Sequence, residues 1–556
     1  MAVNAVVKIK SCSKGGAMTG LGRHAAFWRA QSVAYVGVAL LAMAPASAMA
    51  GTHTTASLPH AKMTPQQEEA AGLAAHHAKH YRQAMKWFRK AAAAGVPRAM
   101  ADIGLNYLNG QGVTQNNAKA LKWLRRGAAA GSARAMNEIG CLYQFGWAVP
   151  QSYVKAAKWY RRGAAAGNPA AMFNLSLIYS NGEGVAENAP KAIKWALKAA
   201  GLGSVGAMYN IGALYDNHPG IRPNYAEASK WFHKAAAAGD VDAMFALGNF
   251  YNEYSGARPN YPKAIRWYRK AVAAGSTDAM DNLGLMYERG EGVPKNFKKA
   301  LELFRRAIAE GNSFAMCDLS WMYARGWGVP KSAAKEFKWS RMSAEAGSGH
   351  GMLSLGVCYQ HGWGTPRNYK KANYWYRMAA AAGDAGGMNN LGVDYDRGLG
   401  LPVNHTKAFL WYHRAAAVGS GKGSLIATLN IARAYDKGSP PVHLNYAKAA
   451  KWFRKAAIMG YPVAMAKLGY MYRYGQGVKK NYFKAMKWFR KAAASGNAMA
   501  MDGIGDLYME GWAVPQNFQK AVKWYREAIA RAGRFKAGQI AKKQIALIHD
   551  IEGRGG

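Results

Sequence analysis

The sequence predicts an all-α protein, a right-handed α/α superhelical solenoid of about thirteen 36-residue helix-turn-helix repeats. A tryptophan recurs at a fixed interval along most of the 556 residues, each time within an amphipathic helix pattern. A second helix pattern with a central glycine follows each tryptophan segment. Because one such helix pair cannot bury its apolar face alone, the repeats must stack on one another to form a continuous core.

The tryptophan positions define the register of the repeats. They are Trp87, Trp123, Trp159, Trp195, Trp231, Trp267, Leu303 in the seventh place, Trp339, Trp375, Trp411, Trp452, Trp488 and Trp524. The step is 36 residues throughout, except that it is 41 between Trp411 and Trp452. The sequence GSGKGS, residues 419–424, lies in this longer step but lacks the full spacing of a phosphate-binding loop and follows a helix, not a strand. We interpret it as a four-residue insertion between two helices that interrupts the solenoid near residues 419–427.

The first helix of each unit, which we call the tryptophan helix, begins seven residues before the tryptophan position. Asparagine or serine occupies that start in twelve units, and such side chains accept hydrogen bonds from the free N–H groups of a helix N-terminus. These residues are Asn116, Ser152, Asn188, Asn224, Asn260, Asn296, Ser332, Asn368, Asn404, Asn445, Asn481 and Asn517. A glycine such as Gly95 or Gly496 ends the helix.

The second helix, which we call the glycine helix, has the pattern AMxxLGxxY, as in residues 279–287. Its central position holds Gly104, Gly140, Gly212, Gly248, Gly284, Gly356, Gly392, Gly469 or Gly505, and elsewhere Ser176, Ser320 or Ala432. A glycine inside a helix costs up to ~1 kcal/mol relative to alanine. Its recurrence predicts that another helix packs so closely here that little beyond a hydrogen atom fits.

The segment AMDNLGLMYERGEGVPKNFKKALELFRRAIAEG, residues 279–311, resembles the Sel-one-like repeat (SLR) family, a relative of the tetratricopeptide repeats, nearly throughout. The resemblance covers about residues 65–533 and implies a protein-binding adaptor or scaffold. Bacterial members are often exported and serve envelope assembly, exopolysaccharide secretion, signalling or host contact. A cysteine-rich branch is linked to penicillin binding and β-lactam hydrolysis, but this chain lacks the pair of cysteines per repeat that marks that branch.

The ends of the chain differ from the repeats. Residues 1–50 are interpreted as a signal peptide, since a basic, acid-free segment precedes an apolar stretch and a small-residue cleavage site near Ala48 or Ala50. An uncleaved membrane anchor is the alternative, although the apolar run is shorter than the ~18–20 residues that a span needs. Cleavage implies a periplasmic or secreted bacterial protein. Residues 51–63 are expected to form a flexible leader, residues 64–533 the solenoid with an initial capping helix, and residues 534–556 a C-terminal capping helix and tail.

Three cysteines remain after such cleavage, namely Cys141, Cys317 and Cys358. Their odd number and irregular spacing indicate no disulfide framework. Each lies in a helix pattern beside apolar residues, so we expect buried, small hydrophobic side chains. A bridge between Cys317 and Cys358 in neighbouring repeats is the alternative.

Basic residues form four columns on the tryptophan helices. The formal net charge is +44, and lysine or arginine recurs at positions −4, −1, +2 and +3 relative to the tryptophan position, 41 times in all. At 100° per residue these columns form one stripe of ~120° opposite the apolar arc. The partner-binding candidates in the stripe are Lys86, Arg89, Lys122, Arg125, Lys158, Arg161, Lys487 and Arg490.

Two interpretations of the stripe stay open. It either keeps an alanine-rich solenoid in solution or forms a positive track that binds polyanions with salt-sensitive affinity. In the second case the partner is an acidic envelope or secreted protein, an anionic polysaccharide, or lipid head groups. Export would separate the protein from chromosomal nucleic acid, and the sequence does not indicate the oligomeric state.

Aromatic residues supply further candidates. Between the seventh and tenth units the cations of the stripe give way to other residues, namely Glu302, Met342, Tyr374, Met378, Leu410 and His413. The same region adds Trp321, and tryptophan also lies in four turns of the GWG or GWA type. The partner-binding candidates of this group are Trp147, Trp327, Trp363, Tyr374 and Trp512, because tryptophan and tyrosine are favoured in binding hot spots. Packing on the adjacent helix is the alternative for the turn tryptophans.

Catalytic candidates are few, and we expect no catalytic residue, cofactor or metal. Ser152 with Lys155, and Ser332 with Lys335, match the SxxK motif of penicillin-interacting enzymes, but both serines occupy the helix-cap column. The histidines at 76, 77 and 80 could place two imidazoles on one helix face without a third ligand. The sequence therefore predicts an exported, non-catalytic scaffold, and the alternative is a cell-wall hydrolase or a penicillin-binding or β-lactamase-like enzyme.

Overall fold

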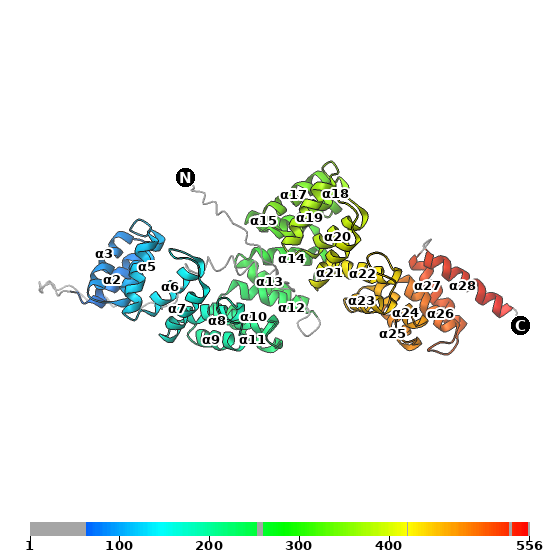
Figure 1. Cartoon of the computed structure of the whole chain (residues 1–556), viewed down its shortest axis with the longest axis horizontal. Coiled ribbons are helices and arrows are strands. Elements are labelled where there is room, and N and C mark those ends of the chain that lie inside the picture. Colours follow the sequence, from blue (N-terminus) through cyan, green and yellow to red (C-terminus); the bar gives the residue numbers. More distant parts are fainter. Residues whose placement is uncertain (1–62, 253–258, 420, 533–535, 554–556) are drawn as a thin grey trace. The chain divides into compact units, whose positions relative to one another are not determined.

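The computed structural model describes residues 63–252, 259–419, 421–532 and 536–553, which form 27 helices and no strand (Figure 1). The helices alternate between the two predicted types, which confirms the all-α solenoid of tandem repeats. They belong to two compact units, one up to Glu310 and one from Gly311 onward. The predicted signal peptide and all of the predicted leader but Met63 lie outside the described residues.

The tryptophan helices are the odd-numbered ones. In the first unit they are α3 (Tyr81–Ala93), α5 (Asn117–Ala129), α7 (Tyr153–Ala165), α9 (Ala189–Gly201), α11 (Tyr225–Ala237), α13 (Tyr261–Ala273) and α15 (Phe297–Ala309). In the second unit they are α17 (Ala333–Glu345), α19 (Tyr369–Ala381), α21 (His405–Ala417), α23 (Tyr446–Ile458), α25 (Tyr482–Ala494) and α27 (Phe518–Ala532). All but α27 have 13 residues, so the tryptophan helices have a constant length from repeat to repeat.

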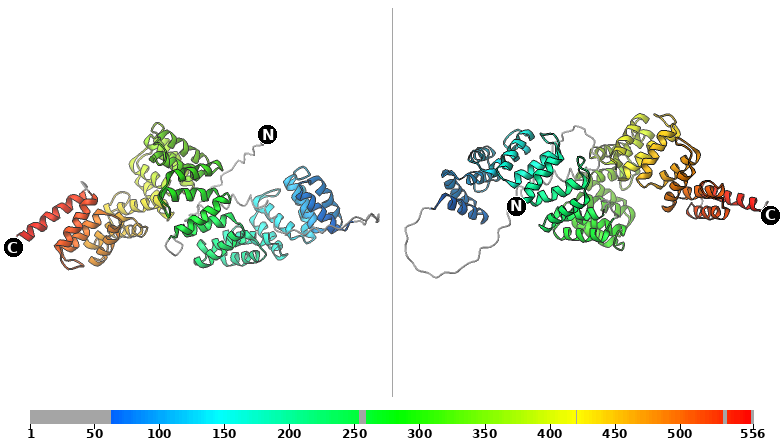
Figure 2. Two further views of the ribbon diagram at one scale, coloured as in Figure 1. Left: turned by 180° about the vertical axis from the view of Figure 1, so that it is seen from behind. Right: turned by 90° about the horizontal axis from the view of Figure 1, so that it is seen from below.

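The glycine helices are the even-numbered ones between them. In the first unit they are α4 (Pro97–Asn109), α6 (Ala133–Phe145), α8 (Pro169–Asn181), α10 (Val205–Asn217), α12 (Val241–Asn252) and α14 (Thr277–Arg289). In the second unit they are α16 (Ser313–Arg325), α18 (Gly349–His361), α20 (Ala385–Arg397), α22 (Gly421–Lys437), α24 (Pro462–Tyr474) and α26 (Ala498–Met509). Figure 2 shows the two kinds of helix packed side by side along each unit.

Helices of a different sequence pattern lie at both ends. The first, α2 (Pro65–His77), begins at the predicted cap, where the Thr64 hydroxyl accepts from the Gln67 N–H at 3.2 Å and the Gln67 side chain accepts from the Thr64 N–H at 2.9 Å. The last, α28 (Lys536–Gly553), packs on α27. The α2 helix therefore covers the first tryptophan helix in the way that a glycine helix covers the others, since Gly72 lies against the ring of Phe88.

The predicted asparagine and serine caps are confirmed. Each of the twelve side chains accepts a hydrogen bond from the backbone N–H three residues later, at distances of 2.7–3.4 Å. Glycine helices end in left-handed glycines such as Gly110 and Gly290, at φ 67° and 76°. Local sequence therefore fixes both ends of these helices.

The close approach predicted at the central glycine is confirmed, and its cause is a side-chain ring. A Cβ atom on Gly284 would lie 2.6 Å from Cε1 of Phe304, and one on Gly140 would lie 2.5 Å from Cε1 of Tyr160. The group that fills the space belongs to the next tryptophan helix, 20 residues later, in all nine repeats with this glycine. These side chains are Leu124, Tyr160, Phe232, Tyr268, Phe304, Tyr376, Tyr412, Phe489 and Tyr525.

Two repeats without the glycine also lack the ring. Where serine replaces glycine at Ser176 and Ser320, the residues 20 positions later are Ala196 and Ser340, both fully buried. The Oγ atoms of Ser320 and Ser340 lie 2.7 Å apart, so a hydrogen bond replaces the ring contact. In these two repeats the glycine and the ring are therefore lost together, as two halves of one packing contact. The contact varies elsewhere, since Gly104 faces Leu124 and the repeat with Ala432 keeps the buried ring of Phe453.

The insertion near residue 420 takes a different form from the one predicted. The sequence analysis placed four extra residues between two helices, but α22 has 17 residues and begins at Gly421, one turn earlier than the other glycine helices. Four of the five extra residues in this step extend α22 by about one turn, since an α-helix has 3.6 residues per turn. The fifth lies between α22 and α23. The added turn packs on the start of α20, where a Cβ on Gly423 would meet the backbone of Gly386.

The three described cysteines, Cys141, Cys317 and Cys358, are buried and form no disulfide, as expected for small hydrophobic side chains. No disulfide joins Cys317 to Cys358. The Cys317 Sγ instead lies 3.5 Å from Ser354 Oγ on the next glycine helix.

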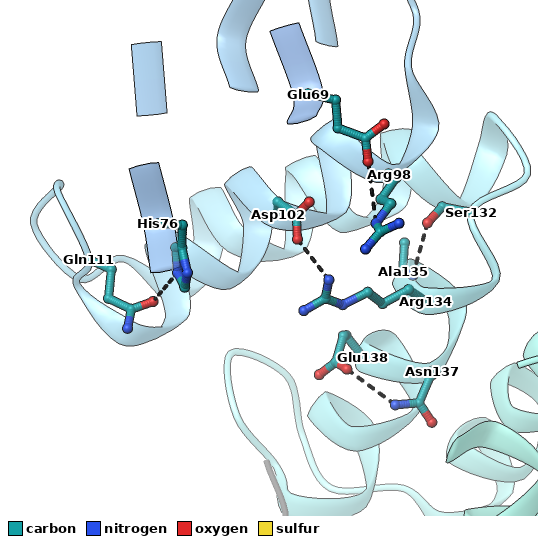
Figure 3. Close-up of polar contacts among 10 residues, drawn as sticks. All are labelled: Glu69, His76, Arg98, Asp102, Gln111, Ser132, Arg134, Ala135, Asn137 and Glu138. Carbon is teal, nitrogen blue, oxygen red and sulfur yellow. Dashed lines mark hydrogen bonds and ion pairs between the residues drawn. The ribbon is translucent and has the colours of Figure 1, made fainter. Parts of the chain in front are cut away.

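Polar side chains bridge consecutive glycine helices. In the first unit Glu69 pairs with Arg98 at 3.3 Å and Asp102 with Arg134 at 2.9 Å, which links α2, α4 and α6 (Figure 3). The corresponding pairs further along are Asn137–Asn174, Ser176–Asn210, Asn249–Asn282, Gln360–Asp394, Asn389–Asn430, Asp436–Lys467 and Arg473–Asp506. This polar seam holds successive repeats in register and contains many of the acidic groups.

Candidate binding surface

The positive charge of the protein resides on the tryptophan helices. These thirteen helices hold 45 lysines and arginines against 5 acidic residues. The remainder of residues 51–556 holds 24 lysines and arginines against 25 acidic residues. The glycine helices, turns and ends are therefore electrically balanced. The excess positive charge thus lies on the more exposed of the two helix types.

The +3 cations lie over the tryptophan of their own helix. The Lys90 ammonium is 4.6 Å from the centre of the Trp87 ring, and eight other tryptophan helices repeat this contact at 4.2–5.2 Å. Such a cation–π contact contributes about 0.5–1 kcal/mol when it is exposed to solvent. The column therefore shields one face of each half-buried tryptophan.

The −4 and +2 cations meet at the tyrosine of the glycine helix between them. The Lys191 ammonium of α9 lies 5.6 Å from the Tyr179 ring of α8, and Arg161 of α7 donates a hydrogen bond to the Tyr179 hydroxyl at 3.2 Å. All eleven lysines at −4 lie 5.1–5.9 Å from such a ring. Arg89, Arg269 and Arg454 make the same hydrogen bond at 2.8–3.5 Å.

These tyrosines were not singled out by the sequence analysis, although their position is regular. Each follows the central position of the glycine helix by three residues, as Tyr179 follows Ser176, and precedes the next −4 lysine by twelve residues, or by thirteen in the case of Tyr435. The recurrence could have been seen in the sequence, but the two cations come from helices on either side of the tyrosine. Three columns of the stripe thus make contacts within the solenoid as well as facing solvent.

The predicted basic candidates are all exposed. Lys86, Lys122, Lys158 and Lys487 occupy the −1 position, and Arg125 and Arg490 occupy the +2 position without the tyrosine hydrogen bond seen for Arg89 and Arg161. The cationic surface is defined here as the lysines and arginines at −4, −1, +2 and +3 of the tryptophan helices. Its −1 column is the part with the fewest internal contacts.

Each of the four turn tryptophans packs against residues near it. Trp147 is 36% exposed and stacks on Phe145 at 5.0 Å, and Trp363 is 43% exposed and stacks on His361 at 4.7 Å. The half-buried Trp327 has the Arg325 guanidinium 5.6 Å from its ring centre.

Trp512 differs from the other turn tryptophans. It is half-buried, stacks on Tyr482 at 4.7 Å and packs against the apolar core of the second unit. Trp363 therefore presents a free ring face, whereas Trp512 fills a structural position.

The cationic surface is interrupted on α19 and its neighbours. Tyr374 at −1 is 55% exposed, Met378 at +3 is 38% exposed, and Leu410 at −1 of α21 is 57% exposed. The Tyr374 ring contacts Trp375 edge-on at 5.2 Å. The sequence analysis noted the missing cations, and the structure adds that apolar side chains exposed to solvent take their places.

The SxxK serines act as helix caps. The Ser152 Oγ accepts from the Lys155 N–H at 3.4 Å, and the Ser332 Oγ accepts from the Lys335 N–H at 3.3 Å. The lysine ammonium groups lie over Tyr143 and Tyr323, at 5.5 and 5.2 Å. Each lysine thus belongs to the tyrosine contacts of the −4 column and not to a nucleophile pair.

The structure also bears on the histidines near the start of the solenoid and on membrane-spanning helices. His76 Nε2 lies 3.1 Å from Gln111 Oε1 (Figure 3), and the described residues contain no group of three or more His, Cys, Asp or Glu side chains placed to hold a metal ion. Within the same part of the chain, no helix combines the length and apolar character needed to span a membrane.

Two buried acids with raised pKa values, Asp394 and Asp502, lie on glycine helices and not on the cationic surface. Burial raises the pKa of the Asp394 carboxyl to about 7, partly offset by Arg397. Burial, followed by the neighbouring Asp506, raises the pKa of Asp502 to about 7 as well. Asp394 contacts Gln360 of the preceding glycine helix at 3.4 Å, so its protonation bears on the junction between two repeats.

Comparison with known families identifies the repeat. The Sel1 repeat model matches thirteen consecutive segments between residues 79 and 532, including 97–132, 133–168 and 277–312. The chain belongs to the Sel1 repeat family. Each full family unit consists of a glycine helix and the tryptophan helix after it, which are the two helices joined by the glycine–ring contact. Residues 421–424 lie between two matched segments and coincide with the extra turn of α22.

Solved structures with similar folds include two further repeat proteins. The crystal structure of c5321, a protective antigen of uropathogenic Escherichia coli strains displaying an SLR fold, is 28% identical, with 84% of this chain and 90% of that chain covered and a TM-score of 0.42. A Sel1 repeat protein from Oxalobacter formigenes is 30% identical, with 57% and 90% covered and a TM-score of 0.40. The search of curated proteins gave no match. Family membership rests on the thirteen repeat matches, and Sel1 repeats mediate protein–protein interactions.

Proposed function

We propose that this Sel1 repeat protein is an exported, non-catalytic scaffold that holds acidic partner proteins on its cationic surface in the bacterial envelope. The observation that supports the proposal most directly is the segregation of charge, with 45 cations and 5 acids on the tryptophan helices and near-balance elsewhere. A surface of repeated, exposed lysines attracts an acidic partner over a Debye length of ~8 Å at physiological salt. It therefore raises the association rate as well as the affinity.

The four cation columns differ in how firmly contacts within the solenoid hold their side chains in place. The +3 and −4 cations are held over aromatic rings, so their positions are fixed before a partner arrives. The −1 lysines, such as Lys122 and Lys158, extend from the same helices as freely exposed charges. An acidic chain lying across several tryptophan helices would contact one set of charges per repeat.

A charge-matched pair of variants tests this role. The test variant combines Lys122→Gln, Arg125→Gln and Lys158→Gln, three exposed positions of the cationic surface. The control combines Arg222→Gln, Lys422→Gln and Lys479→Gln, three exposed cations outside the tryptophan helices. Both variants lose three charges, so an effect of net charge alone would be the same in each.

Binding of fluorescent polyglutamate to residues 51–556 provides the readout at two salt concentrations. We expect the wild type to bind at low salt, the control to bind almost as well, and the test variant to bind several-fold more weakly. Equal losses in both variants would show that only net charge matters, and the cationic surface would then have no specific role. Tighter binding of a sulfated polysaccharide than of polyglutamate would identify an anionic polysaccharide as the partner class instead.

Export is tested separately from binding. Mass spectrometry of the protein purified from its own cells should find a mature N-terminus after Ala48 or Ala50, in the periplasmic or secreted fraction. An intact N-terminus in the cytoplasm would overturn the envelope assignment. Cross-linked pull-down from the envelope, washed at low and then high salt, would next identify the partner.

A further inference from the structure

Where the cationic surface is interrupted, on α19 and the neighbouring tryptophan helices α17 and α21, apolar residues occupy positions that hold cations in most other repeats. At −1, ten units place lysine or arginine, whereas Tyr374 and Leu410 stand in the ninth and tenth units. At +3, Met342 and Met378 replace the cation in the eighth and ninth units. All four residues lie in the second compact unit, on the consecutive tryptophan helices α17, α19 and α21.

These substitutions expose aromatic and sulfur-containing surface. Trp375 has Met378 at the position from which a cation covers tryptophan in nine other repeats, and Tyr374 contacts its ring edge-on. Tyr374 and Met378 are separated by four residues on α19, so they share one face of the helix. We call Met342, Tyr374, Met378 and Leu410 the apolar patch.

Cations border the apolar patch. On α19, Lys371 and Arg377 are exposed within three residues of Tyr374, and Lys338 and Arg414 are exposed on α17 and α21. On α19 the exposed Tyr374 and Met378 thus lie among exposed cations, and on α21, the next tryptophan helix, Leu410 and Arg414 are both exposed. A second copy of this chain would bring an equally cationic surface against it, so self-association through this face is electrostatically unfavourable.

We propose that the apolar patch docks an acidic amphipathic peptide segment of a protein partner, with its apolar side chains on Tyr374, Met378 and Leu410 and its carboxylates toward the bordering cations. This inference rests on the proposed function, because it names the kind of partner that the cationic surface selects. Methionine and tyrosine supply adaptable, polarizable contacts for apolar anchors. A polyanion without apolar groups would leave the patch unused.

Salt dependence distinguishes the affinity contributed by the bordering cations from the affinity contributed by the apolar patch. Pairing of carboxylates with the exposed bordering cations weakens as salt rises, whereas burial of apolar anchors does not. Burial of one leucine side chain corresponds to roughly 10- to 100-fold in affinity. Binding at this site should therefore retain a salt-resistant component that polyglutamate binding lacks.

Two synthetic peptides of equal charge separate these contributions. Both contain the same glutamates, but one has leucines spaced as i, i+3, i+4 and i+7, and the other has serines at those positions. Their binding to residues 51–556 is measured by fluorescence anisotropy at low and high salt. The leucine peptide should bind at least about tenfold more tightly than the serine peptide and should remain bound at high salt.

The test variant restores the residues found in other repeats, with Tyr374→Lys, Met378→Lys and Leu410→Lys. Because lysine occupies equivalent exposed positions in folded repeats, the variant should keep the melting temperature of the wild type. We expect it to bind the serine peptide more tightly and the leucine peptide with no remaining advantage. A reciprocal variant, Lys487→Tyr with Lys491→Met on α25, should gain affinity for the leucine peptide.

The outcomes distinguish the two proposals. Equal binding of both peptides to the wild type would overturn the docking role of the apolar patch while leaving the cationic surface intact. A leucine advantage that persists in the lysine variant would likewise place the contact elsewhere and refute the assignment. Failure of the wild type to bind either peptide or polyglutamate would overturn the proposed function itself.

Discussion

The glycine–ring contact makes a quantitative prediction at Gly284 of α14. An alanine Cβ there would lie 2.6 Å from Cε1 and 3.0 Å from Cδ1 of Phe304, and ordinary contacts of this kind begin near 3.4 Å. The Phe304 side chain has no exposed surface, so the ring cannot move into solvent. Overpacking costs about 1–3 kcal/mol, and the better helix propensity of alanine returns up to ~1 kcal/mol. Gly284→Ala should therefore destabilise this repeat by about 1–2 kcal/mol.

Hydrogen exchange measured by mass spectrometry is the suitable assay, because a stack of repeats opens locally. Amides of α14 and α15 should exchange roughly 5- to 30-fold faster in the Gly284→Ala variant. Gly201 provides the control, since it ends α9, has an ordinary φ angle, and has no atom within 4 Å of the added Cβ. Gly201→Ala should leave exchange in α9 unchanged or slow it.

A double-mutant cycle shows whether the ring is the cause. Phe304→Ala alone should cost about 3–5 kcal/mol through the cavity it leaves. Adding Gly284→Ala in that background should cost nothing further, giving a coupling energy of about 1–2 kcal/mol. The pairs of small residues at Ser176 with Ala196 and at Ser320 with Ser340 are natural examples of such compensation. An equal cost of Gly284→Ala in both backgrounds would refute the reasoning.

Three other predictions concern titration, caps and turn tryptophans. The raised pKa of Asp394, about 7 against 3.8 for an unperturbed carboxyl, means that the folded state favours the protonated form. Stability should thus fall as pH rises from 4 to 7 and then level off, and Asp394→Asn should reduce this fall in melting temperature between pH 5 and pH 8. Ser332→Ala should cost about 1 kcal/mol in chemical denaturation whereas Ser332→Asn should be neutral, since Asn fills the same cap in ten units. If the rival enzymatic hypothesis holds, the wild type will turn over nitrocefin and both variants will abolish that turnover. Trp512→Ala should lower the melting temperature by several degrees because this ring packs under Tyr482, and Trp363→Ala, with its exposed ring, should change it little; equal shifts would contradict the distinction between them.

The exposed fraction of the turn tryptophans illustrates what sequence pattern leaves open. Trp147 and Trp512 both follow a helix-ending glycine and precede alanine, so their local sequences are equivalent. They differ because Trp512 meets Tyr482 from the preceding tryptophan helix, α25, whereas Trp147 meets Phe145 of its own glycine helix. A partner 30 residues away is chosen by packing, and no local pattern reports it.

Local chemistry, in contrast, determined the repeat register, the helix ends and the columns of charge. Asn116 caps α5 because its side chain reaches an N–H three residues away, and left-handed glycines end the helices because they lack a Cβ atom. These interactions lie within one or two turns of helix. The sequence therefore predicted them, together with the family resemblance that the thirteen repeat matches confirmed.

Tertiary structure decided which groups meet across helices. It placed Phe304 over Gly284, converted an expected loop insertion into an extra turn of α22, and set Tyr179 between Arg161 and Lys191. It also separated cations that are held over rings from the −1 lysines that face solvent alone. These contacts join residues 12 to 20 positions apart on different helices, so they depend on how helices pack and not on the spacing within any one of them.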